Sequence, residues 1–255
     1  MPQISVITVV KDHAAGLSRT TDSIKGQDFQ DWELIIVVGE STDMTLTTAL
    51  KIQQTDFRVR VIEQDGLGIY SAMNQGLTAA SGEFTWFMNA GDKFFSSMVL
   101  RHALEMIRTC PVGLVIGGYS LETLKKNKVY PNSERRLKPY SFAFNRRSGC
   151  HQSMLFRTSS IKELGGFDTQ FLLASDFDLV LRLMHQFDGH GTSEIFATIE
   201  PGGAADRGIH QVYREKHIIR QMLLKGPYVR YLSFAWTVMA KLRFAIKRCI
   251  PFIAS

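Results

Sequence analysis

The stretch from Glu63 to Asp92, EQDGLGIYSAMNQGLTAASGEFTWFMNAGD, decides the fold of this chain of 255 residues. It predicts a strand end, a glycine-bearing turn, a helix over Ile69–Ala80 and a second strand over Glu83–Met88. The second strand leads into the small-residue loop Asn-Ala-Gly-Asp, which ends on a single acid, Asp92. An α/β sheet places a metal-binding acid and a phosphate ligand together at such a strand end. The stretch therefore indicates an enzyme that handles a nucleotide diphosphate.

The sequence before this stretch repeats the alternation of strand and helix. Strand patterns cover Ile4–Val10, Trp32–Val38 and Val59–Glu63, and helical patterns cover Leu17–Lys25 and Thr45–Gln53. Near-continuous apolar strands separated by helices predict an α/β fold with a Rossmann-like, mostly parallel central sheet flanked by helices. Ligands of such sheets bind at the carboxyl ends of the strands, so we expect the loops there to line one crevice.

The sequence after Asp92 is more mixed. A strand is predicted over Gly113–Glu122, with a hairpin turn before Val129. Two further strands are predicted over Gln152–Arg157 and near Ile195–Ile199, and helices up to Leu164 and over Asp176–Phe187. The sequence contains no repeat, low-complexity tract or linker before residue 225. We therefore expect one catalytic domain over residues 1–225.

Composition and charge exclude several classes of protein. A hydrophobic content of 45% is ordinary for a globular protein and argues against wholesale disorder. Three widely spaced cysteines predict a reducing compartment, with no disulfide framework and no zinc site. The chain enters its first strand without a signal-peptide pattern, so we expect a cytoplasmic protein.

The net charge of +6 and the isoelectric point of about 9.3 favour an acidic partner such as nucleic acid, an anionic membrane or a phosphorylated substrate. Basic residues gather at Lys125–Lys128, Arg135–Lys138 and Arg146–Arg147, and none of these clusters belongs to a nucleic-acid-binding motif. We interpret them as a solvated loop face and expect no nucleic-acid partner.

Residues 226–255 form a basic, aromatic-rich tail that differs in kind from the rest. On a helical wheel Arg230, Ser233, Thr237, Lys241 and Arg248 share one narrow face, and nearly everything else is apolar. Lys241 and Arg243 interrupt the apolar run too soon for a membrane span. The pattern favours an amphipathic helix in the headgroup region of an anionic bilayer. The alternative is a helix packed on the domain's own core or on a second subunit, which would make a homo-oligomer.

The loops at the predicted strand ends supply candidate donor contacts. The loop Thr8–Asp12 suits a nucleotide base or ribose, although any parallel sheet has such a loop. In the loop Gly39–Asp43 small residues let the backbone approach a ligand, and Asp43 is best explained as a helix cap. Asp65 follows a strand and can touch ribose or the donor sugar.

Tyr70 and Asn74 lie four residues apart on one face of the predicted helix, so both are expected to point into the crevice. Asn74 has poor helix propensity, which indicates a specific hydrogen bond.

Two acids carry the predicted chemistry. Magnesium needs few protein ligands because it keeps waters and takes oxygens from substrate phosphates, so Asp92 alone suffices in principle. Asp176 falls in the first turn of a predicted helix, where the helix N-terminus favours an ionised carboxylate. An ionised, positioned Asp176 suits a general base for hydroxyl deprotonation. Ser175 and Asp178 have the spacing of a capping box.

The order SVITVV, WELIIVV-GESTDMT, EQDGLGIYSAMNQG, FMNAGD, HQSMLF, GGFD and SDFDLVLR resembles the family 2 glycosyltransferases of the GT-A fold. The resemblance covers about residues 3–205 and is closest to bacterial exopolysaccharide and lipopolysaccharide enzymes such as the colanic-acid transferases. It implies an inverting transferase that uses a nucleotide-diphosphate sugar and a divalent cation, Mg²⁺ or Mn²⁺. The implied acceptor is a saccharide or a polyprenyl-diphosphate-linked saccharide at the inner face of the cytoplasmic membrane.

The resemblance also implies roles for individual positions. Asp92 matches the metal ligand of the DXD-like motif, and Asp176 matches the catalytic base. His151 and Gln152 match a motif on the acceptor side. The other implied positions are donor contacts at Thr8, Val10, Lys11, Glu40, Asp65, Tyr70, Asn74, Asn89 and Gly91, and a diphosphate loop at Gly202, Gly203 and Arg207. For Arg207 a surface role is an equal alternative.

Two departures from the family pattern bear on these roles. Val38 stands where the family has an aspartate after the second strand, which puts uracil-type base recognition in doubt unless Glu40 substitutes. Gly91 stands where the commoner motif has its first aspartate. The alternatives are a catalytically impaired nucleotide-sugar-binding relative and a sugar nucleotidyltransferase. The second would carry a glycine-rich basic loop, which ThrValValLysAsp is not.

Overall fold

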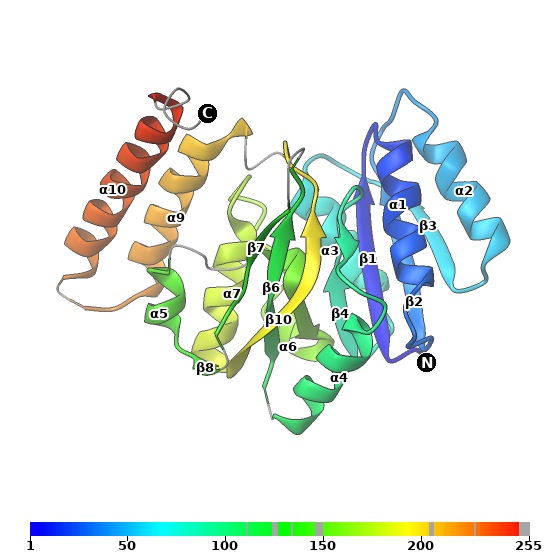
Figure 1. Ribbon diagram of the computed structural model, residues 1–255, viewed down its shortest axis with the longest axis horizontal. Helices are drawn as coiled ribbons and strands as arrows, with labels where there is room; N and C mark the ends of the chain where they lie inside the picture. The colour runs from blue at the N-terminus through cyan, green and yellow to red at the C-terminus, as the bar shows by residue number, and fades with distance from the viewer. Residues whose placement is uncertain are drawn as a thin grey trace.

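The computed structural model describes residues 1–110, 112–123, 127–133, 135–145, 150–203, 207–226 and 228–249. These residues form a central sheet with helices on both faces (Figure 1). The strands are β1 Ile4–Val10, β2 Trp32–Val38, β3 Val59–Glu63, β4 Phe84–Phe87, β5 Lys93–Phe94, β6 Leu114–Leu121, β7 Lys128–Tyr130, β8 Arg135–Leu137, β9 Met154–Arg157 and β10 Gly189–Ile199. The helices are α1 Ala14–Lys25, α2 Thr45–Thr55, α3 Ile69–Ala79, α4 Val99–Thr109, α5 Pro139–Ala143, α6 Thr158–Glu163, α7 Ser175–Gln186, α9 Ile209–Leu223, α10 Val229–Cys249 and a 3₁₀ turn, η1 His151–Ser153.

The sheet has the order β3-β2-β1-β4-β9-β6-β10-β5, with β7 paired to β6 and β8 paired to β10. The strands β3, β2, β1 and β4 are parallel to one another. β9 is antiparallel to both of its neighbours, and β10 is parallel to β6. Because two reversals cancel, β6 and β10 run in the same direction as β1 and β4. The loops that follow β1, β2, β4 and β10 therefore open on one edge of the sheet.

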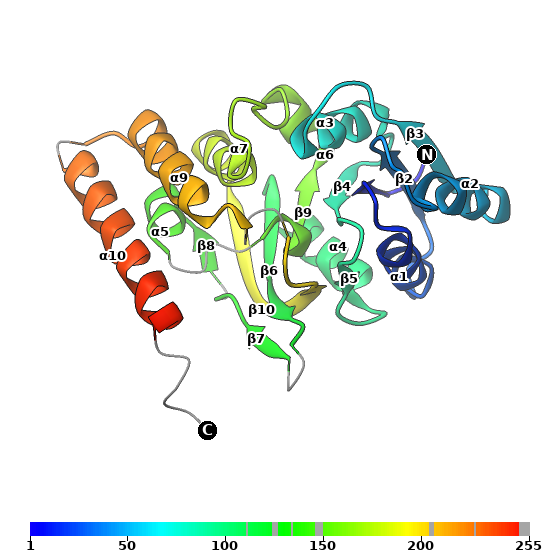
Figure 2. The same cartoon turned by 90° about the horizontal axis from the view of Figure 1, so that it is seen from above.

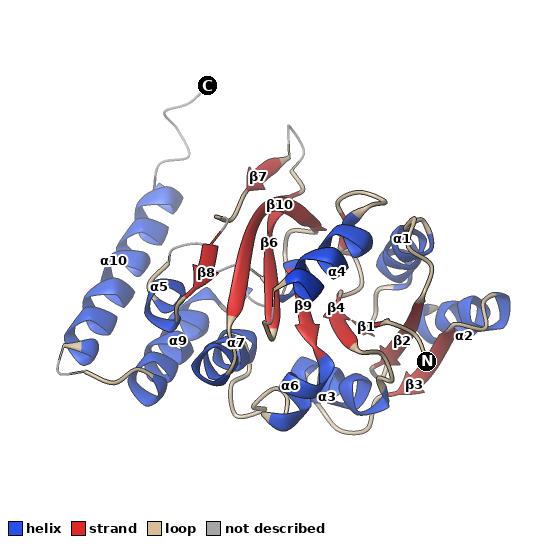
Figure 3. Cartoon of the chain, turned by 90° about the horizontal axis from the view of Figure 1, so that it is seen from below, coloured by secondary structure: helices blue, strands red, loops and turns tan. Residues whose placement is uncertain are grey.

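Alternate side chains of each strand feed two separate cores, because successive residues of a strand point to opposite faces. Ile7 and Val9 of β1 pack with α3, α6 and α7 on one face. Ile4 and Val6 pack with α1, α2 and α4 on the other. Figure 2 shows these two helical layers from above, and Figure 3 shows them from below.

Helix α3 lies very close to β1, and Gly76 permits this approach. A Cβ atom added at Gly76 would lie 2.4 Å from Cγ2 of Ile7. The second glycine of the GIYSAMNQG motif is thus explained by helix–sheet packing.

The predicted and observed elements agree closely in the first half of the chain. The strands over Ile4–Val10, Trp32–Val38 and Val59–Glu63 are observed with the predicted bounds. The second half needs two corrections. Gln152 does not begin a strand, because residues 151–153 form the turn η1 before β9. Helix α9, over Ile209–Leu223, was not predicted.

The tail forms a helix, α10, and only part of its polar stripe faces solvent, because Arg230 and Lys241 are exposed. Ser233 and Thr237 are buried, and Ser233 Oγ lies 2.8 Å from Nδ1 of His217 on α9. Trp236 Nε1 donates to the carbonyl of Phe144 at 3.0 Å. The small polar residues therefore face the protein, and large apolar residues face outward.

Among the described helices, none combines the length and apolar character that crossing a membrane requires. The basic clusters expected at Lys125–Lys128 and Arg146–Arg147 lie largely outside the described residues. The cluster Arg135–Lys138 contains the short strand β8, so it is not only a loop.

Candidate active site

Asp92 lies in the loop between β4 and β5 at the carboxyl edge of the sheet. It is 5% exposed, and both of its carboxylate oxygens accept hydrogen bonds. Gln152 Nε2 donates to Oδ2 at 2.7 Å, and the backbone N–H of Glu200 donates to Oδ1 at 2.9 Å. Burial raises the pKa of Asp92 to about 6 because desolvation outweighs these hydrogen bonds. Among the described side chains no cation forms an ion pair with it.

Asp176 is the second residue of α7 and is held from three sides. The hydroxyl of Tyr70 donates to Oδ1 at 3.3 Å, and the N–H of Phe177 reaches the same oxygen at 2.8 Å. Nδ1 of His151 lies 3.3 Å from Oδ2. Burial acts to raise the pKa of Asp176, but the hydrogen bond and electrostatic attraction of His151 and the charge of Lys216 outweigh it. The pKa of Asp176 therefore lies below its usual range.

Two adjacent residues in turn η1 connect the two acids. His151 contacts Asp176, and Gln152 contacts Asp92. Asn89, in the loop before Asp92, donates from Nδ2 to Nε2 of His151 at 3.1 Å. The sequence placed His151 and Gln152 on the acceptor side; in the fold these neighbours bring both predicted acids into one polar network.

Glu200 follows β10 and explains why residue 91 is glycine. Its carboxylate pairs with Nε2 of His13 at 2.8 Å and with Arg19. A Cβ atom at Gly91 would lie 2.0 Å from Oε2 of Glu200, and Gly91 has a φ of +102°. The carboxylate of Glu200 thus occupies the space that a side chain at residue 91 would need. Sequence reasoning missed Glu200, although it is an acid directly after a strand.

The loop after β1 needs a correction. Thr8 and Val10 were expected to contact a donor, but both side chains are buried in the strand, at 0% and 6% exposure. The exposed side chains at this strand end are Lys11 and Asp12. Asp12 accepts from the N–H of Thr42 at 2.7 Å, which joins the loops after β1 and β2.

In the loop after β2, Glu40 is exposed. Asp43 accepts from the N–H of Thr45, the first residue of α2, at 2.8 Å, although the N-cap residue is Met44 rather than Asp43.

The motif around α3 divides into three environments. Asp65 is exposed after β3. Tyr70 is buried against Phe167, with ring centroids 5.3 Å apart, and contacts Asp176. Asn74 exchanges two hydrogen bonds of 2.8 Å with the backbone of Phe167. Both polar groups of the Asn74 amide are therefore used within the fold, which confirms the specific hydrogen bond expected for Asn74, whereas its donor contact stays a prediction.

The loop after β10 begins next to Asp92, through the N–H of Glu200. Gly202 and Gly203 are exposed, and Gly202 has a φ of +88°. Arg207 is also exposed and donates from Nη1 to the carbonyl of Gly202 at 3.0 Å. The expected diphosphate loop is thus on the same edge as Asp92; residues 204–206 lie outside the described residues.

The capping box predicted at the start of α7 does not form. Ala174 is the N-cap residue, and Ser175 already belongs to the helix. Asp178 instead forms an ion pair with Nε of Arg182 at 2.7 Å, one turn further along.

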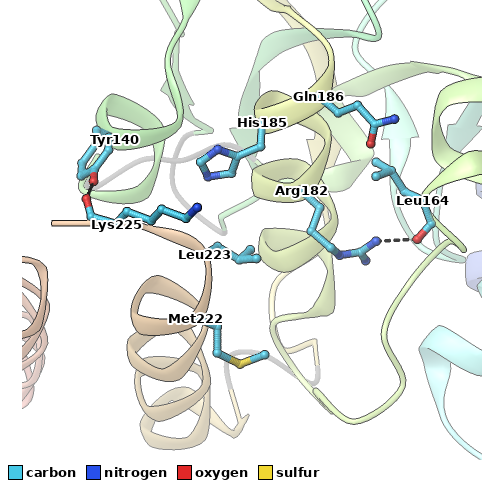
Figure 4. A pocket seen from close by; sticks show the side chains of 8 residues that line it. All are labelled: Tyr140, Leu164, Arg182, His185, Gln186, Met222, Leu223 and Lys225. Atoms are coloured by element: carbon cyan, nitrogen blue, oxygen red, sulfur yellow. Dashed lines mark hydrogen bonds between the residues drawn. The ribbon is translucent and has the colours of Figure 1, made fainter.

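A cavity of about 660 Å³ lies at the other end of α7 (Figure 4). His185, Met222 and Lys225 are among the residues that line it. Neither Asp92 nor Asp176 lines this cavity, so it is not part of the acid network.

Comparison with known proteins identifies the family. The model described as glycosyl transferase family 2 matches residues 5–165. An uncharacterized glycosyltransferase of Mycobacterium tuberculosis is 31% identical over 185 residues, which are 71% of this chain and 68% of that protein. A GalNAc(5)-diNAcBac-PP-undecaprenol beta-1,3-glucosyltransferase of Campylobacter jejuni is 33% identical over 98 residues, which are 38% of this chain and 32% of that protein. The chain therefore belongs to glycosyl transferase family 2, and it is a glycosyltransferase.

Solved structures show the same fold. S. aureus TarS 1-349 in complex with UDP-GlcNAc superposes with a TM-score of 0.71 at 16% identity, over 90% of this chain and 69% of that chain. The mannosyltransferase PcManGT of Pyrobaculum calidifontis, in complex with GDP-Man and Mn²⁺, has a TM-score of 0.65 at 18% identity, over 94% of this chain and 75% of that chain. The GT-A fold expected from the sequence is confirmed.

Proposed function

We propose that this glycosyltransferase is an inverting enzyme that moves a sugar from a nucleotide-diphosphate sugar to a saccharide or lipid-linked acceptor. Asp176 is the general base, and Asp92 is the protein ligand of a divalent cation. The observation that carries the proposal is the His151–Gln152 pair, whose side chains contact one acid each. Transfer requires that the acceptor hydroxyl and the donor diphosphate lie next to each other. A network that joins the base, which binds the hydroxyl, to the cation ligand, which faces the diphosphate, can hold them in this way.

The residues around Asp92 fit a cation that is shared with substrate. Asp92 is a buried carboxylate whose pKa is raised to about 6, so a positive charge there relieves the cost of its burial. The described residues contain no group of three His, Cys, Asp or Glu side chains able to hold a metal. Mg²⁺ or Mn²⁺ bound by Asp92 would therefore take its other oxygens from the diphosphate and water. Such an ion offsets charge on the leaving diphosphate. The similar PcManGT structure contains GDP-Man and Mn²⁺.

Asp176 is prepared to remove a proton from the acceptor hydroxyl. Its pKa is lowered despite burial, so it is ionised at neutral pH. Tyr70 and His151 hold its two oxygens, which leaves the carboxylate one orientation. The acceptor oxygen then attacks the anomeric carbon from the face opposite the diphosphate. We assign Lys11, Glu40 and Asp65, all exposed at strand ends, to the donor side.

The test is a transfer assay with a panel of nucleotide sugars and a matched pair of variants. Asp176→Asn should lower the rate by about 100- to 10,000-fold and leave nucleotide binding intact. Asp22→Asn, an exposed change on α1, is the control and should leave the rate unchanged. Full activity in Asp176→Asn would refute the base. Binding without transfer in the unaltered protein would favour an impaired binding relative, and pyrophosphate release from a nucleoside triphosphate would favour a nucleotidyltransferase.

We further propose that α10 docks the enzyme on an anionic membrane surface. Its outward face carries large apolar side chains with exposures of 75% for Tyr231, 63% for Phe234 and 57% for Leu242. Arg230 and Lys241 are exposed beside them, and residues 226–255 contain no acid. A helix whose small polar residues face the protein, and whose apolar and basic residues face outward, suits an acyl–headgroup boundary better than water. Docking there would bring a lipid-linked acceptor to the enzyme.

Vesicle sedimentation tests this surface. Phe234→Glu should release the protein from phosphatidylglycerol vesicles. The control is Phe57→Glu, at a side chain 96% exposed and remote from α10. If both variants sediment like the unaltered protein, α10 is not the docking surface. A dimer that Phe234→Glu dissociates in analytical ultracentrifugation would assign the face to a second subunit instead.

A further inference from the structure

Helix α9 carries a buried carboxylate that the mechanism above does not use. Glu215 is 6% exposed and forms no ion pair with a described cation. Its Oε2 accepts from the backbone N–H groups of Leu173 and Ala174, both at 2.9 Å, and its Oε1 accepts from the N–H of Leu172 at 3.2 Å. Three consecutive N–H groups thus converge on one carboxylate. Such an arrangement stabilises negative charge without a cationic partner.

The segment held by Glu215 leads directly into the base. Ala174 is the N-cap of α7, and Asp176 follows two residues later. Neither Ala174 nor Ser175 caps α7 with its side chain. Glu215 thus accepts from the N–H of the N-cap residue Ala174 and from those of the two residues that precede it, all outside the first turn of α7. The contact fixes the backbone from which the Asp176 side chain projects.

Two further residues of α9 hold the residue on the other side of the base. Lys216 Nζ lies 4.8 Å from the ring centroid of Phe177, and Arg220 Cζ lies 5.3 Å from it. The backbone before Asp176 and the side chain after it are thus both anchored to α9. A change in the position of α9 would turn the carboxylate relative to His151 and Tyr70.

We infer that Glu215 is a positioning residue for Asp176, which orients the base through the backbone of residues 172–174 and does not touch the reactants. The inference rests on the proposed role of Asp176. It assigns to α9, which also supports α10, the task of aligning the base.

Steady-state kinetics with saturating acceptor test the inference. Glu215→Gln replaces one carboxylate oxygen by an NH₂ group, which faces the N–H of Leu172 in one orientation of the amide and the N–H groups of Leu173 and Ala174 in the other. We expect kcat to fall about 10- to 100-fold, because small displacements of a reacting group have effects of this size. The KM for the donor and the affinity for the free nucleoside diphosphate should change less than about twofold, because the donor side is built on β1 to β4. A merely structural role would change these values together with kcat.

Two control variants accompany it. Gln211→Ala removes the only described side chain that donates to Glu215, at 2.8 Å, and leaves the three backbone bonds. It should retain kcat within about twofold. Glu163→Gln makes the same chemical change on the exposed surface of α6 and should have no effect. An unchanged kcat in Glu215→Gln overturns the inference.

Assaying Asp176→Asn beside Glu215→Gln distinguishes a failure of the positioning role from a failure of the proposed function. Loss of activity in Asp176→Asn with normal kcat in Glu215→Gln removes only the positioning role, whereas normal activity in Asp176→Asn removes the base itself. If Glu215→Gln does not fold, Glu215→Asp keeps the charge on a shorter side chain and should give a smaller loss of kcat. Hydrogen exchange of the unaltered protein gives an independent measurement. The amides of residues 172–174 should be protected, and rapid exchange there would contradict the inference.

Discussion

Replacing Asp92 by Asn should stabilise the metal-free protein above neutral pH while it removes the cation ligand. Burial raises the pKa of Asp92 from 3.8 to about 6. At about 1.4 kcal/mol per pKa unit, ionised Asp92 lowers the free energy of unfolding by on the order of 3 kcal/mol. Asn carries no charge, and its amide can keep both hydrogen bonds if the amide of Gln152 turns over. The variant thus avoids this cost.

The pH dependence of the stability difference shows whether the ionisation of Asp92 causes it. Below pH 3.8 the carboxyl group is protonated in the folded and unfolded states, so it costs nothing. Between 3.8 and about 6 the folded state binds more protons, and the cost grows as the pH rises. Above about pH 6 the cost is complete. The Asn variant should therefore gain its advantage across this window.

Urea unfolding at about pH 4.5 and pH 8 in a chelator measures the difference. The variant should be more stable than the unaltered protein by about 3 kcal/mol at pH 8 and by only about 1 kcal/mol at the lower pH. Mn²⁺ with a nucleoside diphosphate should stabilise the unaltered protein but not the variant. The difference between their free energies of unfolding should then become smaller. A difference that is the same at both pH values, or a variant less stable at pH 8, would refute the reasoning.

Three further predictions concern neighbouring contacts. His151→Ala should raise the pKa of Asp176, because His151 gives the largest contributions that lower it, so the acid limb of the pH–rate profile should move to higher pH; an unmoved limb would count against the contact. Gly76→Ala should destabilise the protein by about 1–3 kcal/mol in urea unfolding, because the new Cβ would lie 2.4 Å from Ile7 Cγ2; an unchanged midpoint would contradict this. Asn74→Ala should cost about 1–3 kcal/mol by losing both bonds to Phe167 and leave donor affinity unchanged in calorimetry; weaker donor binding would restore Asn74 as a donor contact.

The first half of the fold was predictable because its signals are local. Apolar runs bounded by turn residues define β1, β2 and β3, and each was predicted with its observed bounds. The loop that ends on Asp92 was predictable for the same reason: one acid follows one buried strand. The family resemblance was confirmed, whereas the roles of the individual site residues stay proposals.

The contacts of the site were not predictable, because they depend on side chains far apart in the chain. Glu200 stands beside Gly91 only after β10 has joined the sheet. Helix α9 was missed because Glu215 and Arg220 are buried at positions that a hydrophobic pattern treats as solvent. The helical pattern of the tail left a membrane face and packing on the domain open, and it could not show that Ser233 meets a histidine on α9.

The adjacency of His151 and Gln152 has a mechanical consequence. One peptide unit separates the side chain that contacts Asp176, the proposed base, from the side chain that contacts Asp92, the proposed cation ligand. Any rotation of turn η1 therefore moves a contact of Asp176 and a contact of Asp92 together. Under the roles proposed for Asp92 and Asp176, one short turn influences the position of the leaving diphosphate and that of the attacking hydroxyl, so a substitution that moves one is expected to move the other.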